Sequence, residues 1–191
     1  VTGAPGEYRI AVAGFGGDSG TVRIVARPAT PPSNDDFASP ASLTGALPIK
    51  TTGVSIEATK EQNEPSHSGS VFLPGGASVW WTWTAAANGK VSVSIDGTDF
   101  PAAVAVYTGG SLGALTLVAK STTGQVTFDA VNTQVYRIAV DGTEEGEQGN
   151  ILLQLGNPPP NDDFATPGNL GNTLSATTTG TNEFASKQTG E

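Results

Sequence analysis

The stretch NDDFA occupies residues 34–38 and recurs unchanged at residues 161–165, 127 positions later. From there the match continues without a gap to the last residue, because two leucines, a Thr-Thr-Gly triplet, a lysine and a glutamate recur at the same offset. A second pair, YRIAV at residues 8–12 and 136–140, has an offset of 128. Self-similarity at a fixed period is the signature of a repeat architecture. The sequence therefore predicts tandem modules of about 127 residues.

The repeats divide the chain into three predicted parts. Residues 1–33 hold the C-terminal strands of a preceding module and a linker, residues 34–160 one complete module with its proline linker, and residues 161–191 the N-terminal part of a following module. Prolines at 31–32 and 158–160 favour stiff, extended spacers. Each partial module alone would leave an apolar face and an unpaired strand edge. We expect the missing chain to come from neighbouring sequence or from a neighbouring molecule.

Composition indicates an all-β protein and excludes two classes of partner. The chain has 25 glycines and 13 prolines, and only 14% of its residues are charged. This composition is typical of strands and turns rather than helices. The formal charge of -9 would repel nucleic acids and anionic membrane surfaces. No apolar run approaches the roughly 18 residues needed to cross a bilayer. With no cysteine and an acidic, Gly-rich composition, the chain is predicted to be extracellular or exposed at the cell surface.

Alternation of apolar and polar residues predicts the strands of the complete module. The candidate ranges are 49–57, 79–83, 91–95, 102–108, 114–120, 124–130, 134–141 and 150–155. Asn88-Gly89 is predicted to form a hairpin turn between two of them, because a type I′ turn needs positive φ at both central residues. Antiparallel strands in this number favour a two-layer, jelly-roll-like β-sandwich.

Several motifs occur in the order expected of one known type of repeat. They are NDDFA at the module start, ATK at 58–60, EPSH at 64–67, SVWWTWTA at 78–85, VAVYTG at 104–109 and YRIAVDG at 136–142. This series resembles the bacterial pre-peptidase C-terminal-like β-sandwich repeats of large secreted and cell-surface proteins. The resemblance covers the complete module and both partial ones. It implies a β-sandwich fold and an accessory or scaffold role, and it leaves the ligand open.

Residues suited to catalysis are sparse. His67 is the sole histidine, and its neighbours Ser66 and Ser68 point away from it in a strand or turn, so a serine hydrolase site is not expected. Instead His67 is predicted to bond within the loop from Glu64 to Ser70. The chain has no cysteine, no phosphate-binding Gly-Lys loop and no zinc motif. Its 18 acidic residues could pair as in glycosidases, but nothing marks a pair, so no enzyme is predicted.

Calcium is the most plausible ligand, because hard cations bind clustered carboxylate, amide and carbonyl oxygens. The candidate ligands lie at the module junctions and are Asn34, Asp35, Asp36, Asn161, Asp162 and Asp163. Neither triplet has the spacing of a known calcium loop. An alternative is that Asn34 caps a short helical turn through Phe37.

The three tryptophans, at positions 80, 81 and 83, raise the possibility of a glycan site. Trp81 and Trp83 share a strand face with Val79 and are predicted to lie in the core, which leaves Trp80 as the candidate surface platform for a ligand. The leading hypothesis is nevertheless a non-enzymatic structural or adhesive repeat of a large extracellular protein. Its partners would be neighbouring copies, which complete the partial modules in a stalk or filament. The alternative is a glycan- or protein-binding accessory module of a secreted enzyme.

Overall fold

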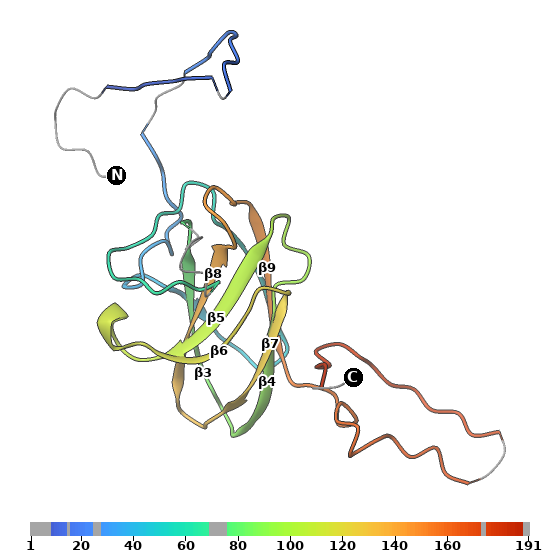
Figure 1. Ribbon diagram of the computed structural model, residues 1–191. Coiled ribbons are helices and arrows are strands. Elements are labelled where there is room, and N and C mark those ends of the chain that lie inside the picture. Colours follow the sequence, from blue (N-terminus) through green and yellow to red (C-terminus); the bar gives the residue numbers. More distant parts are fainter. Residues whose placement is uncertain (1–8, 15, 25–27, 69–75, 173–174, 189–191) are drawn as a thin grey trace.

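The computed structural model describes residues 9–14, 16–24, 28–68, 76–172 and 175–188. Within these ranges it contains nine β-strands, one short 3-10 helix, η1 (Leu112–Ala114), and no α-helix. All the strands lie between residues 41 and 156 (Figure 1). The all-β prediction is confirmed. Over these same ranges, no helix is both long enough and apolar enough to cross a bilayer.

Two sheets pack face to face. The larger has the strand order β1 (Ala41–Leu43), β3 (Val79–Thr84), β8 (Val135–Gly142), β5 (Ala102–Thr108) and β6 (Thr116–Ser121). The smaller has the order β2 (Ile49–Val54), β9 (Asn150–Gly156), β4 (Gly89–Ser94) and β7 (Gln125–Ala130). Every paired neighbour is antiparallel except β1, which runs parallel to β3. From β2 to β9 the chain passes repeatedly between the two sheets, as in a jelly roll.

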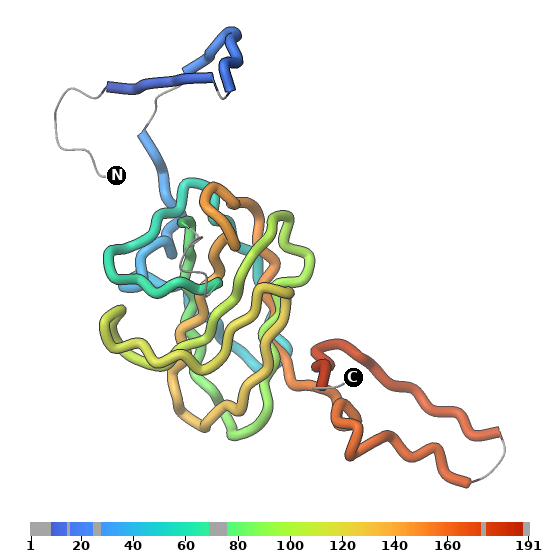
Figure 2. The backbone as a smooth tube through the Cα atoms, in the orientation of Figure 1, coloured from blue at the N-terminus to red at the C-terminus, as the bar shows by residue number. Residues whose placement is uncertain are grey.

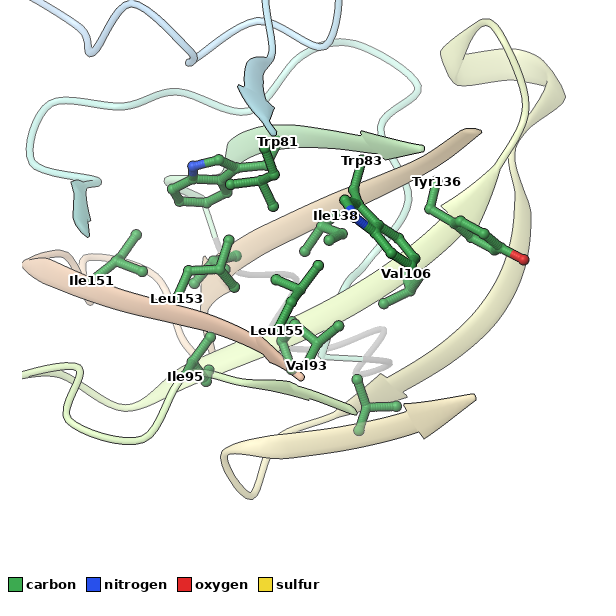
Figure 3. Packing of buried hydrophobic residues seen from close by; sticks show 14 of the residues in the cluster. Trp81, Trp83, Val93, Ile95, Val106, Tyr136, Ile138, Ile151, Leu153 and Leu155 are labelled. Carbon is green, nitrogen blue, oxygen red and sulfur yellow. The ribbon is translucent and has the colours of Figure 1, made fainter. Parts of the chain in front are cut away.

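The main core lies between the sheets (Figure 3). From β3, Val79, Trp81 and Trp83 point into it, as the alternation predicts, and all three are at least 95% buried. Ile151, Leu153 and Leu155 of β9 face them from the smaller sheet. Trp83 stacks near Tyr136 with 5.8 Å between ring centroids. Burial of this apolar surface is the main stabilising contribution to the sandwich.

The predicted hairpin at Asn88-Gly89 is wrong. β3 and β4 flank this turn but belong to different sheets, so the turn carries the chain across the end of the sandwich. The Asn88 carboxamide oxygen accepts a hydrogen bond from the Asn132 backbone N–H at 2.7 Å, which joins this crossing to the loop between β7 and β8. The turn residues are as predicted, but pairing partners in a sandwich are decided by packing across the core.

Two extended segments leave the sandwich in different directions (Figure 2). Residues 9–24 extend from one end and residues 161–188 from another, and neither contains an assigned strand among its described residues. Ile10, Val12 and Ile24 are more than half exposed. The division into tandem modules stays a prediction, and these two segments are where its partial modules would lie.

Candidate functional site

A second cluster of buried side chains covers the outer face of the five-stranded sheet. Trp80 lies at its centre, in contact with Phe37 and Tyr107. The Phe37 and Trp80 rings meet edge to face with 5.1 Å between centroids, and the Arg137 guanidinium lies 4.9 Å from the Phe37 centroid. These contacts combine hydrophobic burial with favourable aromatic and cation–π geometry.

The prediction that Trp80 is a surface platform is wrong. Alternation does place Trp80 on the outer face of the sheet, but its exposed fraction is 0%. The chain around Phe37 and the loop bearing His67 cover it, with the His67 and Trp80 ring centroids 5.2 Å apart. Period-two alternation tells the two faces of a strand apart, but it does not say whether a loop covers the outer one.

Asn34 connects the start of the NDDFA motif to this sheet. The Trp80 backbone N–H donates to the Asn34 carbonyl at 2.8 Å, and the Asn34 side-chain amide donates to the Trp80 carbonyl at 3.1 Å. Asn34 therefore bonds to β3 instead of capping a helical turn, and no helix follows it. This pairing holds the covering segment over Trp80.

Two further hydrogen-bonded contacts join the NDDFA motif to the loop that follows β2. The Asp35 carboxylate accepts from the Thr59 backbone N–H at 2.6 Å and from the Thr59 hydroxyl at 3.0 Å. The Phe37 backbone N–H donates to the Glu61 carboxylate at 2.6 Å. We call these two contacts, Asp35 to Thr59 and Phe37 to Glu61, the clasp. The clasp fixes the loop that carries Glu64 and His67.

That loop brings a network of polar groups under the surface. The Glu64 carboxylate accepts from His67 Nε2 at 2.7 Å, from the Glu61 backbone N–H at 2.8 Å and from the Ser78 hydroxyl. His67 Nδ1 lies 2.9 Å from the Tyr107 hydroxyl. Burial raises the pKa of Tyr107, with the negative charges of nearby carboxylates adding to the effect. The phenol therefore keeps its proton and donates it to Nδ1.

The network contains serine, glutamate and histidine but in the wrong order for nucleophilic catalysis. In a catalytic triad the histidine lies between the serine and the acid, so that it can accept the serine proton. Here Glu64 lies between Ser78 and His67, and His67 spends its second nitrogen on Tyr107. Both His67 and Ser78 have an exposed fraction of 0%. As predicted, His67 bonds within its own loop to Glu64, and it also reaches β5.

A buried ion pair completes the outer cluster. The Asp141 carboxylate, at the end of β8, is fully buried and lies 2.9 Å from the Lys60 ammonium. It also accepts from the backbone N–H groups of Gly76 and Ala77, both at 3.1 Å. A buried carboxylate needs this full set of partners, because an unpaired buried charge is strongly destabilising. These partners account for the buried charge of Asp141 and give its carboxylate a structural role.

The candidate calcium ligands do not come together. The first triplet lies where the N-terminal segment joins the sandwich, and the second lies on the C-terminal segment (Figure 1). Asp35 and Asp162 both accept hydrogen bonds inside their own segments, Asp163 accepts from Gln188, and Asp36 and Asn161 are exposed. Across the described part of the chain, no three His, Cys, Asp or Glu side chains are grouped as metal ligands. Calcium at the junctions stays a prediction.

A shallow groove of about 710 Å³ runs along β7. Its walls are mostly polar and come from both the sandwich and the C-terminal segment. Lys90, Lys120 and Lys187 line it, which places three of the five lysines of an acidic chain around one groove. Asp96 and Asp129 line it as well, so its charges are mixed.

Sequence reasoning missed several residues that build these sites. Ser78, Tyr107 and Asp141 each lie inside a motif used for the family resemblance, yet no pattern showed that they bond to Glu64, His67 and Lys60 respectively. The contacts between the C-terminal segment and the smaller sheet were also missed. One available signal was the change from Glu57 in the first copy to an aromatic residue, Phe184, in the second.

Comparison with known proteins gives little further guidance. No protein-family model matches the chain, and no curated protein is significantly similar to it. Among solved structures, the chain is similar to the crystal structure of Aeromonas hydrophila PliG, a periplasmic inhibitor of g-type lysozyme. The two share 14% identity with a TM-score of 0.37, over 60% of this chain and 94% of that one. A likeness this distant supports no inference about function.

Proposed function

We propose that this chain is a non-enzymatic structural or adhesive repeat of a large extracellular or cell-surface protein. The observation that supports it best is the clasp, which forms twice, 127 residues apart. In the second copy the Asp162 carboxylate accepts from the Ser186 N–H and hydroxyl, both at 2.7 Å, and the Phe164 N–H donates to Gln188 at 2.9 Å. Residues 161–188 therefore repeat the clasp hydrogen bonds of residues 34–61, as the start of a further module would in this proposal.

The chemistry of the outer cluster is consistent with this role. Its serine, histidine, carboxylates and tyrosine bond to one another, and the cluster leaves no exposed nucleophile next to a base. Such a network orders a loop over a sheet at a unique position. A repeat that transmits load along a stalk needs stable, uniquely packed modules, whereas an enzyme needs an accessible reacting group.

The partial modules indicate neighbouring repeats as the partners. Ile10 and Val12 are 63% and 57% exposed, whereas their counterparts in the complete module, Ile138 and Val140, are fully buried. Apolar strand residues left uncovered favour pairing with another sheet. In this proposal the covering strands come from an adjacent module of the same protein or of a neighbouring copy, and the result is a stalk or filament.

A glycan- or protein-binding accessory module is the alternative function. Its best support is the groove over β7, where lysines, hydroxyls and amides face one open surface. Trp80 lies buried on the other sheet, and Phe128, the aromatic residue that lines the groove, is only 7% exposed, so neither offers the aromatic platform that favours sugar stacking. The alternative therefore relies mainly on polar contacts.

Electron microscopy and light scattering of the purified chain over a range of concentrations would test the proposal. We expect end-to-end particles with an axial spacing of about one module, formed with no added ligand. Repeating the measurement with a calcium chelator tests the predicted junction sites, because loss of the particles would place calcium there. Monodisperse single particles that bind a glycan or protein array would overturn the structural role in favour of the alternative.

A further inference from the structure

The C-terminal segment returns to the sandwich at the outer face of the smaller sheet. The Ser92 hydroxyl of β4 donates to the Phe184 carbonyl at 3.0 Å. The Gln125 side-chain amide of β7 donates to the Phe184 carbonyl at 3.3 Å and to the Ala185 carbonyl at 3.0 Å. Phe184 is only 9% exposed, although its segment otherwise extends into solvent.

The Phe184 ring fits a position with no side chain. Gly156 ends β9, and a Cβ atom added there would lie 2.3 Å from two atoms of the ring. Next to the ring, Glu183 forms an ion pair with Lys50 of β2. We call the surface formed by Lys50, Ser92, Gln125 and Gly156 the seat. The seat holds the turn at residues 182–185 through the fit of the Phe184 ring over Gly156, two side-chain hydrogen-bond donors and one ion pair.

At the preceding junction the turn at the equivalent position also contacts the end of the preceding repeat, through a carboxylate instead of a ring. Glu57 lies 127 positions before Phe184, and Thr30 lies 127 positions before Asn157, the neighbour of Gly156. The Thr30 backbone N–H donates to the Glu57 carboxylate at 2.7 Å. At both junctions, then, this turn contacts the last residues before the proline linker.

The two turns also share an unusual backbone. Glu57 and Phe184 have φ values of 67° and 63°, in the left-handed region that side-chain-bearing residues rarely adopt. Each is followed by the same closing bond, Ala58 N–H to Ser55 carbonyl at 2.9 Å and Ala185 N–H to Asn182 carbonyl at 3.0 Å. A strained conformation kept in two copies with different side chains indicates a role for the turn itself.

From these contacts we infer that the turn at Glu57 in one copy and Phe184 in the next acts as a joint between modules. It docks each module onto the end of strand β9 of the module before it. This inference rests on the proposed tandem organisation. The joint fixes the angle between successive modules, so the array is a stiff stalk instead of beads on flexible proline linkers. The partner that fits the seat is a following module with an aromatic residue at the Phe184 position. Where a module carries a glutamate at this position, as at Glu57, its carboxylate accepts a backbone hydrogen bond instead of inserting an aromatic ring.

Distance measurements between spin labels test the joint directly. The chain has no cysteine, so Thr116→Cys on β6 and Thr178→Cys on the C-terminal segment give two unique labelling sites, and both are exposed. A docked turn predicts a narrow distance distribution for this doubly labelled chain. Phe184→Ala should cause loss of the narrow peak, and so should Gly156→Ala, whose methyl group would occupy the space of the ring.

Phe164→Ala is the matched control. It removes the same side chain from the same segment, but Phe164 is 89% exposed, so the narrow peak should remain. A broad distribution in the parent chain, or a narrow one that survives Phe184→Ala, would overturn the joint. The result is separable from the stalk proposal: a narrow distribution in a chain that never forms end-to-end particles supports the joint alone, whereas particles with a broad distribution support flexible assembly and contradict the joint.

Discussion

Residues 34–61 and residues 161–188 are two copies of one segment in two different environments. In both, an aspartate bonds to the residue 24 positions later, and a phenylalanine N–H bonds to the residue 24 positions after it. Yet Phe37 is 6% exposed and Phe164 is 89% exposed. The hydrogen bonds of the clasp therefore follow from the local sequence, while burial of the aromatic ring needs a sheet that carries Trp80.

The comparison also separates what stabilises the segment from what stabilises the module. A clasp over a sheet encloses the network of Glu64 and His67, and in that setting its hydrogen bonds are shielded from water. The same bonds on an extended segment compete with solvent and contribute less. Equivalent substitutions in the two copies should consequently have unequal effects.

Phe37→Ala should have the largest effect and Phe164→Ala almost none. Removing the Phe37 ring leaves a cavity against Trp80 and exposes Arg137, so we expect the free energy of unfolding to fall by about 3–5 kcal/mol. Phe164→Ala should change it by about 0.5 kcal/mol or less. Urea unfolding followed by tryptophan fluorescence measures both. Equal effects would mean that the two copies are in equivalent environments in solution.

Asp35→Ala and Asp162→Ala compare the clasp itself in the two settings. Loss of the Asp35 carboxylate leaves the half-buried N–H of Thr59 without its acceptor, which should cost about 1–3 kcal/mol. Asp162→Ala should leave the unfolding of the sandwich unchanged and should increase hydrogen exchange at the Ser186 amide. If instead Asp162→Ala destabilised the sandwich as much as Asp35→Ala, the C-terminal segment would be an integral part of the folded module.

Much of the fold could be predicted from the sequence because strand alternation reports burial directly. The range 102–108 coincides with β5, and Trp81 and Trp83 lie in the core as expected. β1 was missed, since three residues are too few for alternation to be seen. The turn at Asn88-Gly89 was assigned to a hairpin because turn chemistry is local, whereas the choice of sheet depends on contacts across the whole core.

The outer cluster could not be predicted for a related reason. Its polar members come from loops and from residues flanking strands, where no period links one position to another. Asp35 was a candidate calcium ligand because it belongs to a cluster of carboxylate and amide side chains at a predicted junction, but its oxygens bond to Thr59. The spacing of 24 residues is equal in both copies, but an ungapped repeat gives equal spacing to every pair of aligned positions, so it does not single out the bond from Asp35 to Thr59.

Tyr107→Phe tests the part of the complete module that the second copy lacks. The variant loses the donor to His67 Nδ1, so at neutral pH we expect a loss of about 0.5–1.5 kcal/mol. Because the pKa of Tyr107 is raised in the folded state, the unfolded chain releases this proton first, and the parent protein loses stability as pH rises above about 10. Unfolding measured between pH 8 and 11 should show a steeper alkaline decline for the parent than for the variant. Parallel pH profiles would mean that Tyr107 is accessible to solvent.

The smallest expected effect comes from making the first clasp resemble the second through Glu61→Gln. Burial raises the pKa of Glu61, and the nearby carboxylates of Glu64, Asp36 and Asp35 raise it further, against the bond from Phe37 N–H that lowers it. The ionised form is therefore disfavoured by folding, and this penalty is present at neutral pH and disappears as pH falls through the raised pKa toward the usual 4.5. Glutamine keeps the acceptor, as Gln188 does for Phe164.

We thus expect Glu61→Gln to stabilise the protein at pH 7 by about 0.5 kcal/mol or less, and the gain to vanish near pH 4. Urea unfolding of both proteins between pH 4 and 8 measures the difference. A loss of stability at pH 7 would contradict this expectation, because it would mean that the charged bond from Glu61 to Phe37 outweighs both the burial of the Glu61 charge and the repulsion from the three neighbouring carboxylates. In that case Glu61 would strengthen the clasp of the complete module. The clasp of the second copy, where Gln188 is the acceptor, would then be the weaker of the two.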